Sequence, residues 1–143
     1  AETIRATVIG AGCHSAQLSG STVFHQNISF PLKNLPVAES AEALAAFDGP
    51  GVLALEGIQS PGYSQVAQLA EELAGKIRNV PVILAMREDM AKALGQQLAL
   101  RLGRDVPLLC LDRICLKAGD YLDVGAPVGP ALPVVIKTLI LTK

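Results

Sequence analysis

An alternation of apolar runs and amphipathic segments between residues 52 and 112 is the feature that most constrains the fold. The apolar runs at 52–57, 80–86 and 106–112 are typical of buried strands. The two segments between them repeat apolar residues at helical spacing. Right-handed crossovers through two such helices place three strands parallel in one sheet. The sequence therefore predicts a β-α-β-α-β unit over 52–112.

The ends of the predicted helices are marked by capping residues. Ser60 and Pro61 are suited to begin the first long helix, as cap and first helical residue. Its apolar stripe consists of Val66, Leu69, Ala70, Leu73, Ala74 and Ile77. The second helix is predicted from about Glu88 to Leu102, with Gly103 as its C-terminal cap. A shorter helix over 41–47 follows Ser40, whose hydroxyl can cap it.

The flanking regions are predicted to add strands to this unit. We expect a buried strand over 4–9, a loop over 10–20, and a short strand or hairpin over 22–30. Further extended segments are expected at 35–37, near Tyr121 and over 132–140. The fold class that follows is α/β, with three layers and a mostly parallel or mixed sheet flanked by helices. The 143 residues suit a single domain over 1–143.

Composition excludes several classes of protein. A net charge of −1 and a pI near 6.1 argue against a nucleic-acid binder. Three cysteines without CxxC spacing argue against a disulfide framework or structural zinc site and favour a reducing cytoplasm. Cys110 and Cys115 are interpreted as core thiols. No apolar run is long enough to span a membrane. Because the chain enters a strand at once without Met, we expect it to begin at a domain boundary inside a longer protein.

The segment "VIGAGCHSAQLSGSTVF", residues 8–24, is the most conspicuous candidate for chemistry. It fails the dinucleotide fingerprint because Ser15 stands where a third glycine is needed, and the first following acid is Glu39. The neighbouring Cys13 and His14 make a poor catalytic pair, and a metal site with His25 has equally little support. A capped glycine turn and a nucleotide-facing turn both remain open. An enzyme that uses Cys13 or His14 is a third alternative.

Charged residues at the predicted strand ends form a second candidate set. Glu56, Arg87 with Glu88, and Asp112 each follow a predicted strand at its carboxyl end, where ligands bind in open α/β sheets. The alternative is that these residues are helix caps, loop charges or surface ion pairs. Asp120 and Asp123 could pair with a cation, although their setting among turn signals favours ordinary loop acids.

Several blocks along the chain resemble a known family. They include "IRATVIGAGCHSAQLSGSTVF", "FPLKNLPV", "GVLALEG", "DVPLLCLDRI", "GDYLDVGAPV" and "LPVVIKTL". Together they are similar to the C-terminal part of the ethanolamine ammonia-lyase reactivating factors. The resemblance implies one lobe of an actin/Hsp70-like ATPase fold. It also implies a chaperone-like factor that uses ATP and Mg²⁺ to release damaged cobalamin from the adenosylcobalamin-dependent lyase. The expected partner is ethanolamine ammonia-lyase, with homo-oligomers and association with a bacterial microcompartment as further expectations.

The same resemblance implies a nucleotide-contacting segment. In the wider ATPase superfamily a glycine-rich turn after a strand contacts adenosine. The matching positions here are Gly10, Ala11, Gly12, Cys13, His14 and Ser15. The nearest approach to a DxGxT phosphate loop is "DVGAP" at 123–127, which lacks the Thr or Ser. The chain by itself is therefore not expected to hydrolyse ATP. The alternative function is a stand-alone α/β module that binds a small molecule or a protein without any ATPase role.

Overall fold

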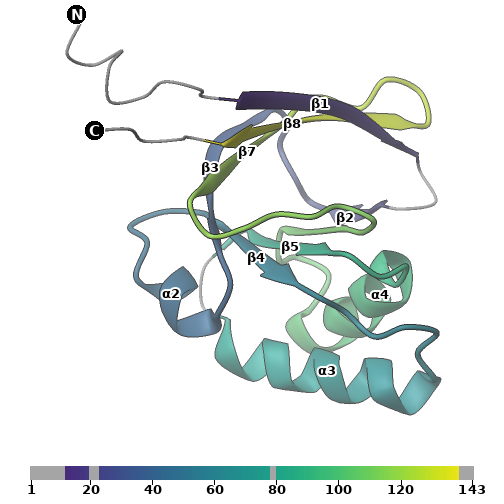
Figure 1. Ribbon diagram of the computed structural model, residues 1–143. Coiled ribbons are helices and arrows are strands. Elements are labelled where there is room, and N and C mark those ends of the chain that lie inside the picture. The colour runs from purple at the N-terminus through teal and green to yellow at the C-terminus, as the bar shows by residue number, and fades with distance from the viewer. Residues whose placement is uncertain (1–11, 20–22, 78–79, 139–143) are drawn as a thin grey trace, which may run out of the picture.

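The computed structural model describes residues 12–19, 23–77 and 80–138 (Figure 1). The strands are β1 (Gly12–Ser19), β2 (Val23–Gln26), β3 (Leu32–Ala38), β4 (Val52–Leu55), β5 (Val82–Met86), β6 (Leu108–Leu111), β7 (Asp120–Val124) and β8 (Ala131–Thr138). The helices are α2 (Ala41–Ala45), α3 (Tyr63–Lys76) and α4 (Ala91–Leu102). The strand predicted over 4–9 lies outside the described residues.

In the described part of the chain, the strands form one mixed sheet of eight strands in the order β1-β8-β7-β3-β4-β5-β6-β2. Strands β3, β4, β5 and β6 are parallel, and the β4-α3-β5-α4-β6 segment confirms the predicted β-α-β-α-β unit. Its register aligns Val52 with Ile83 and Ile83 with Leu109. The remaining strands are antiparallel to their neighbours.

Three layers are stacked in the molecule (Figure 1). The helices cover one face of the parallel strands, and the antiparallel strands β1, β8 and β7 curl over the opposite face. The α/β fold with a mixed sheet flanked by helices is thus confirmed. The layer opposite the helices consists of strands, because the sheet bends back over its own parallel half.

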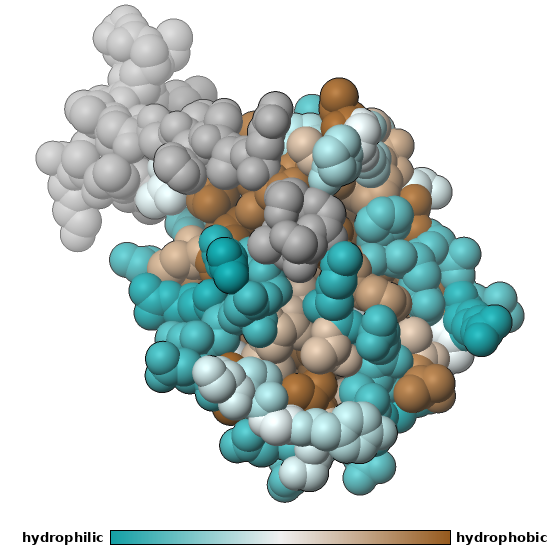
Figure 2. All heavy atoms as spheres, turned by 90° about the vertical axis from the view of Figure 1, so that its right-hand side faces the viewer, coloured by the Kyte–Doolittle hydropathy of each residue, from teal (hydrophilic) through white to brown (hydrophobic). Residues whose placement is uncertain are grey.

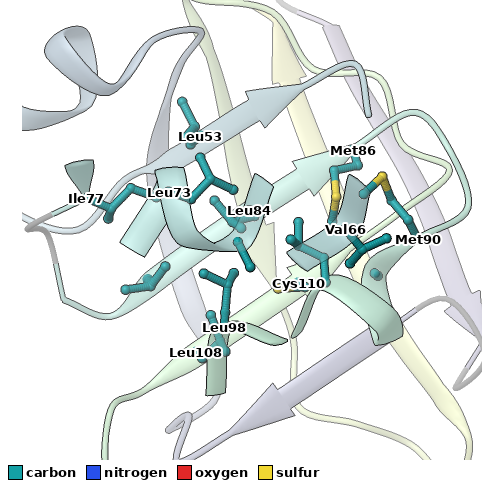
Figure 3. Close-up of a cluster of buried hydrophobic side chains, with 14 of the residues drawn as sticks. Leu53, Val66, Leu73, Ile77, Leu84, Met86, Met90, Leu98, Leu108 and Cys110 are labelled. Atoms are coloured by element: carbon teal, nitrogen blue, oxygen red, sulfur yellow. The ribbon is translucent and has the colours of Figure 1, made fainter. Parts of the chain in front are cut away.

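Two hydrophobic cores separate these layers. The helical core packs the stripes of α3 and α4 on the sheet, with Val66, Leu73, Leu84, Leu98 and Cys110 among its members (Figure 3). The second core lies between the two halves of the sheet and contains no helical residue among its described members. Neighbouring residues of β5 point to opposite cores, because side chains alternate along a strand, and both faces of this strand are buried.

The helix starts differ from the sequence prediction. Helix α3 begins at Tyr63 with Gly62 as its N-cap, so Ser60 and Pro61 do not start it. The backbone N–H of Gly62 donates to Gln65 Oε1 over 2.8 Å, and Ser60 adopts a φ of 45° before the helix. Helix α4 begins at Ala91 rather than near Glu88. The local sequence predicts neither start correctly, because side chains outside the predicted capping positions determine where each helix begins.

The start of α2 and the end of α4 are as predicted, whereas α2 ends at Ala45 and not at the predicted residue 47. Ser40 Oγ accepts from the N–H of Ala43 over 3.1 Å and caps α2. Gly103 ends α4 with a φ of 103°, a conformation that glycine adopts without strain. Within the described ranges, no helix is both long and apolar enough to cross a membrane.

Candidate functional site

A cleft opens at the carboxyl ends of the parallel strands. Its volume is about 320 Å³, and its floor comes from the ends of β4 and β5. The lining residues are Glu39, Ala54, Leu55, Glu56, Ala85, Arg87, Cys115, Leu116 and Lys117. Figure 2 shows the side of the molecule toward which β4 and β5 point in Figure 1. On this side, hydrophobic residues are exposed between hydrophilic ones. We call this hollow the carboxyl-edge cleft.

One wall of the cleft is the segment 113–119, which we call the strap. It leaves the end of β6, crosses the ends of β5 and β4, and reaches β7 beside β3. The N–H of Ile114 donates to Met86 O over 3.1 Å, and the N–H of Ala118 donates to Glu39 Oε2 over 2.8 Å. Both ends of the strap are thus fixed to the sheet edge.

Alternation along the strap separates buried side chains from exposed ones. Ile114 and Leu116 are buried in the second core, whereas Cys115 between them is exposed. The interpretation of Cys115 as a core thiol is therefore wrong. Cys110 is confirmed as a core thiol in β6, where burial raises its pKa well above the ordinary value.

The charges in the cleft include one ion pair. Arg87 Nη1 lies 3.3 Å from Glu56 Oε1, and the side chains are 56% and 66% exposed. The hydrogen bond to Glu56 raises the pKa of the Arg87 guanidinium, and Cys115 adds to the effect. An exposed pair with a single long contact is weak. The ion-pair alternative considered for these two strand-end residues is confirmed, although both also line the cleft.

Asp112 acts as a helix cap. Its Oδ2 accepts from the N–H of Ala91 over 2.7 Å and so fixes the start of α4. The side chain is fully buried, and Oδ1 has no hydrogen-bond partner. Burial raises the pKa of Asp112, and the nearby Asp89 carboxylate adds to the rise, while the bond from Ala91 opposes it. Asp89 itself pairs with Arg113 over 2.9 Å.

Asp120 and Asp123 are buried residues of β7, so the prediction of loop acids is wrong. Asp120 accepts from the N–H of Lys117 and from Thr138 Oγ1, each over 3.0 Å. Asp123 accepts from the N–H of Asn34 over 2.7 Å and lies 2.9 Å from Lys137 Nζ. Burial would raise the pKa of Asp123, but these two partners outweigh it and the pKa is lowered.

Comparison with known proteins identifies the family. The profile of the family described as "Ethanolamine utilisation protein EutA" matches residues 1–48 and 43–142. This chain belongs to the EutA family. It is 34% identical to the ethanolamine ammonia-lyase reactivase EutA of Salmonella typhimurium and 35% identical to that of Escherichia coli. Each comparison covers 97% of this chain and 34% of the relative, so the chain spans about a third of their length. No solved structure matches the chain.

The segment predicted to contact nucleotide falls at the start of the described chain. Gly10 and Ala11 lie outside the described residues. The positions from Gly12 to Ser15 belong to β1, where Gly12 pairs with Thr138 and Ser15 with Val135 of β8. The predicted loop over 10–20 is therefore wrong for residues 12–19, because the backbone there pairs with β8. Nucleotide contact by these six positions of an EutA-family chain stays a prediction.

The carboxyl-edge cleft carries charges of both signs. The carboxylates of Glu39 and Glu56 and the cations of Arg87 and Lys117 all line it. Across the described ranges, no three His, Cys, Asp or Glu side chains are grouped so that they could hold a metal ion. Binding of ATP and Mg²⁺ by the longer protein therefore stays a prediction.

The sequence predicts some of the residues that line this cleft but not the others. Glu56 and Arg87 were signalled by their places after apolar strands. The strap residues Cys115 and Lys117 carried no such signal, because their approach depends on the return of the chain from β6 to β7. Placing these two residues at the cleft requires the strand order, which the local sequence does not give.

Proposed function

We propose that this chain forms an α/β lobe of a reactivase for ethanolamine ammonia-lyase. The supporting observation is the 34–35% identity, across 97% of the chain, to two proteins that bear this name. Because the chain spans about a third of those relatives, the activity belongs to the longer protein, of which this lobe is a part.

The proposed activity is the ATP-dependent release of damaged cobalamin, which lets intact adenosylcobalamin enter the lyase. A reactivase can open the lyase only by binding the open state more tightly than the closed one. Nucleotide binding between lobes would change that difference in affinity. In this proposal Gly10 and Gly12 contact the adenosine through their backbone, and the protein works in the cytoplasm, with the lyase, in association with a bacterial microcompartment.

A chimeric reactivase tests the proposal. Residues 1–143 replace the corresponding third of the Escherichia coli relative, and the lyase is inactivated and then supplied with ATP, Mg²⁺ and fresh adenosylcobalamin. We expect the chimera to restore turnover, with the unmodified relative as positive control and the relative without that third as negative control. A chimera that binds the lyase but never restores turnover would contradict the proposal.

The carboxyl-edge cleft favours a second candidate, a ligand-binding module without any ATPase role. Nucleotide titration of the chimera separates the two. Saturable binding of ATP or ADP that disappears with the third removed supports the reactivase lobe. Absence of saturable nucleotide binding, together with lost reactivation, supports the module.

A further inference from the structure

Small side chains next to the ends of the central strands leave space for the carboxyl-edge cleft. Ala54 and Ala85 lie in the floor, where larger residues would fill the space beneath the strap. The strap is held above them by the bonds of Ile114 and Ala118 to the sheet edge. The cleft is therefore built into the topology. Its volume of about 320 Å³ is at the lower end for ligand pockets, which suits a small ligand.

The charges that line the cleft restrict the chemistry of that ligand. Two of them, on Glu39 and Glu56, are negative, and two, on Arg87 and Lys117, are positive. A purely anionic ligand meets repulsion from the carboxylates, and a purely cationic ligand meets repulsion from the cations. A ligand with one group of each sign can satisfy both pairs.

These charged groups are available to a ligand. The Arg87–Glu56 contact is single, 3.3 Å long and exposed, so a ligand can replace it at little cost. Lys117 makes no side-chain hydrogen bond or ion pair with any residue of the described ranges. Glu39 is oriented through one oxygen by the N–H of Ala118.

We propose that the carboxyl-edge cleft binds a small zwitterion, with its anionic group at Arg87 and Lys117 and its ammonium group at Glu39 and Glu56. The argument uses only the cleft and its charges, so it stands apart from the reactivase role. Loss of reactivation by the chimera would leave it intact.

Titration of the chain with charge-matched probes tests the proposal. Glycine, β-alanine and 4-aminobutanoate offer both charges at increasing separation, while butanoate and butylamine carry one charge each. Backbone ¹H–¹⁵N shifts of Arg87, Cys115 and Ala118 report on the cleft. We expect saturable shifts with at least one amino acid, and binding about tenfold weaker for butanoate and butylamine, since each loses one charge-assisted contact.

Variants assign the binding to the cleft. Arg87→Gln and Lys117→Gln each remove one positive charge, and Glu39→Gln removes a negative charge while its amide oxygen still accepts from Ala118. We expect each to weaken binding of the best amino acid about tenfold. Arg101→Gln is the matched control, because Arg101 lies on α4 and bonds to Gln97. Its binding should equal that of the wild type.

Three results would overturn the proposal. One is the absence of saturable shifts with all three amino acids. Another is butanoate or butylamine binding as tightly as the best amino acid. The third is equal binding by Arg101→Gln and the three cleft variants, which would place the ligand elsewhere.

Discussion

Two aspartates show how the surroundings of a residue, rather than its type, set its role. Asp112 and Asp123 are both buried, yet the pKa of Asp112 is raised and that of Asp123 is lowered. Asp123 has a lysine partner, whereas Asp112 accepts from the backbone at the start of α4 and has another carboxylate nearby. Asp112 therefore ionises at a cost to folding, while Asp123 stabilises the fold as an anion.

Substitution of Asp112 separates its capping role from its charge. Asp112→Asn keeps an oxygen that can accept from Ala91, whereas Asp112→Ala leaves that N–H unpaired. We expect the free energy of unfolding of the alanine variant to be about 1–2 kcal/mol lower than that of the asparagine variant. Urea denaturation at pH 7 measures both. Equal stability of the two variants would contradict a capping role.

The raised pKa of Asp112 also gives a pH dependence with a defined sign. A raised pKa means that the folded state binds the proton more tightly, so protonation of Asp112 stabilises the fold. At pH 7 the asparagine variant should be at least as stable as the wild type. As the pH falls through the raised pKa toward about 3.9, the free energy of unfolding of the wild type should rise relative to that of the asparagine variant. A growing advantage of the variant on acidification would refute this linkage.

The sequence could place Asp112 at a strand end but could not assign its cap. Its partner Ala91 is brought near only when α4 packs beside β6. Likewise, the lysine that pairs with Asp123 is on β8, a neighbouring strand whose register the sequence does not state. Residue types and local spacing are readable in advance, whereas partners from other elements are not.

At the scale of elements, α4 packs on the edge strand β2 through a glycine. A Cβ built on Gly95 would lie 2.4 Å from the ring of Phe24, far inside contact distance. Gly95 is thus required by the approach of helix to strand, although glycine lowers helix propensity. The sequence showed only a glycine in a predicted helix, and the reason for it comes from packing.

A pair of glycine-to-alanine variants tests this packing. Gly95→Ala should lower the free energy of unfolding by about 1–3 kcal/mol, because overpacking against Phe24 outweighs the gain in helix propensity. Gly75→Ala in α3 is the matched control, since nothing lies within 4 Å of its added Cβ. It should raise the free energy of unfolding by up to about 1 kcal/mol. Thermal melts followed by circular dichroism compare them, and stabilisation by both would contradict the close approach.

Element prediction succeeded where the signal is local and failed where it depends on distant pairing. The β-α-β-α-β unit was predicted from apolar runs and helical stripes, and the structure confirms it. Residues 12–19 were predicted as a loop because glycine, serine and histidine give no strand pattern. Their strand is defined by pairing with β8, which comes from the opposite end of the chain.

For the whole molecule, the parallel strands link the three layers, because each of their two faces packs in a different core. Leu84 of β5 belongs to the helical core, and its neighbour Ile83 belongs to the core between the sheet halves. The curling of the antiparallel strands over the parallel half could not be predicted, because strand order and bend are not written in local periodicity. The carboxyl-edge cleft and its strap follow from that arrangement.

Shared strands should make the layers unfold together. Leu122 of β7 is fully buried in the core that has no described helical member. Leu122→Ala should lower the free energy of unfolding by about 2–5 kcal/mol through the cavity that it leaves. The helical signal at 222 nm comes from the opposite layer, so in a cooperative molecule its urea midpoint falls together with that of the β7 amides followed by NMR.

Val128→Ala, at an exposed position between β7 and β8, is the control and should leave both midpoints unchanged. A helical midpoint that stays at the wild-type value in Leu122→Ala would show instead that the helical layer is stable without the antiparallel strands.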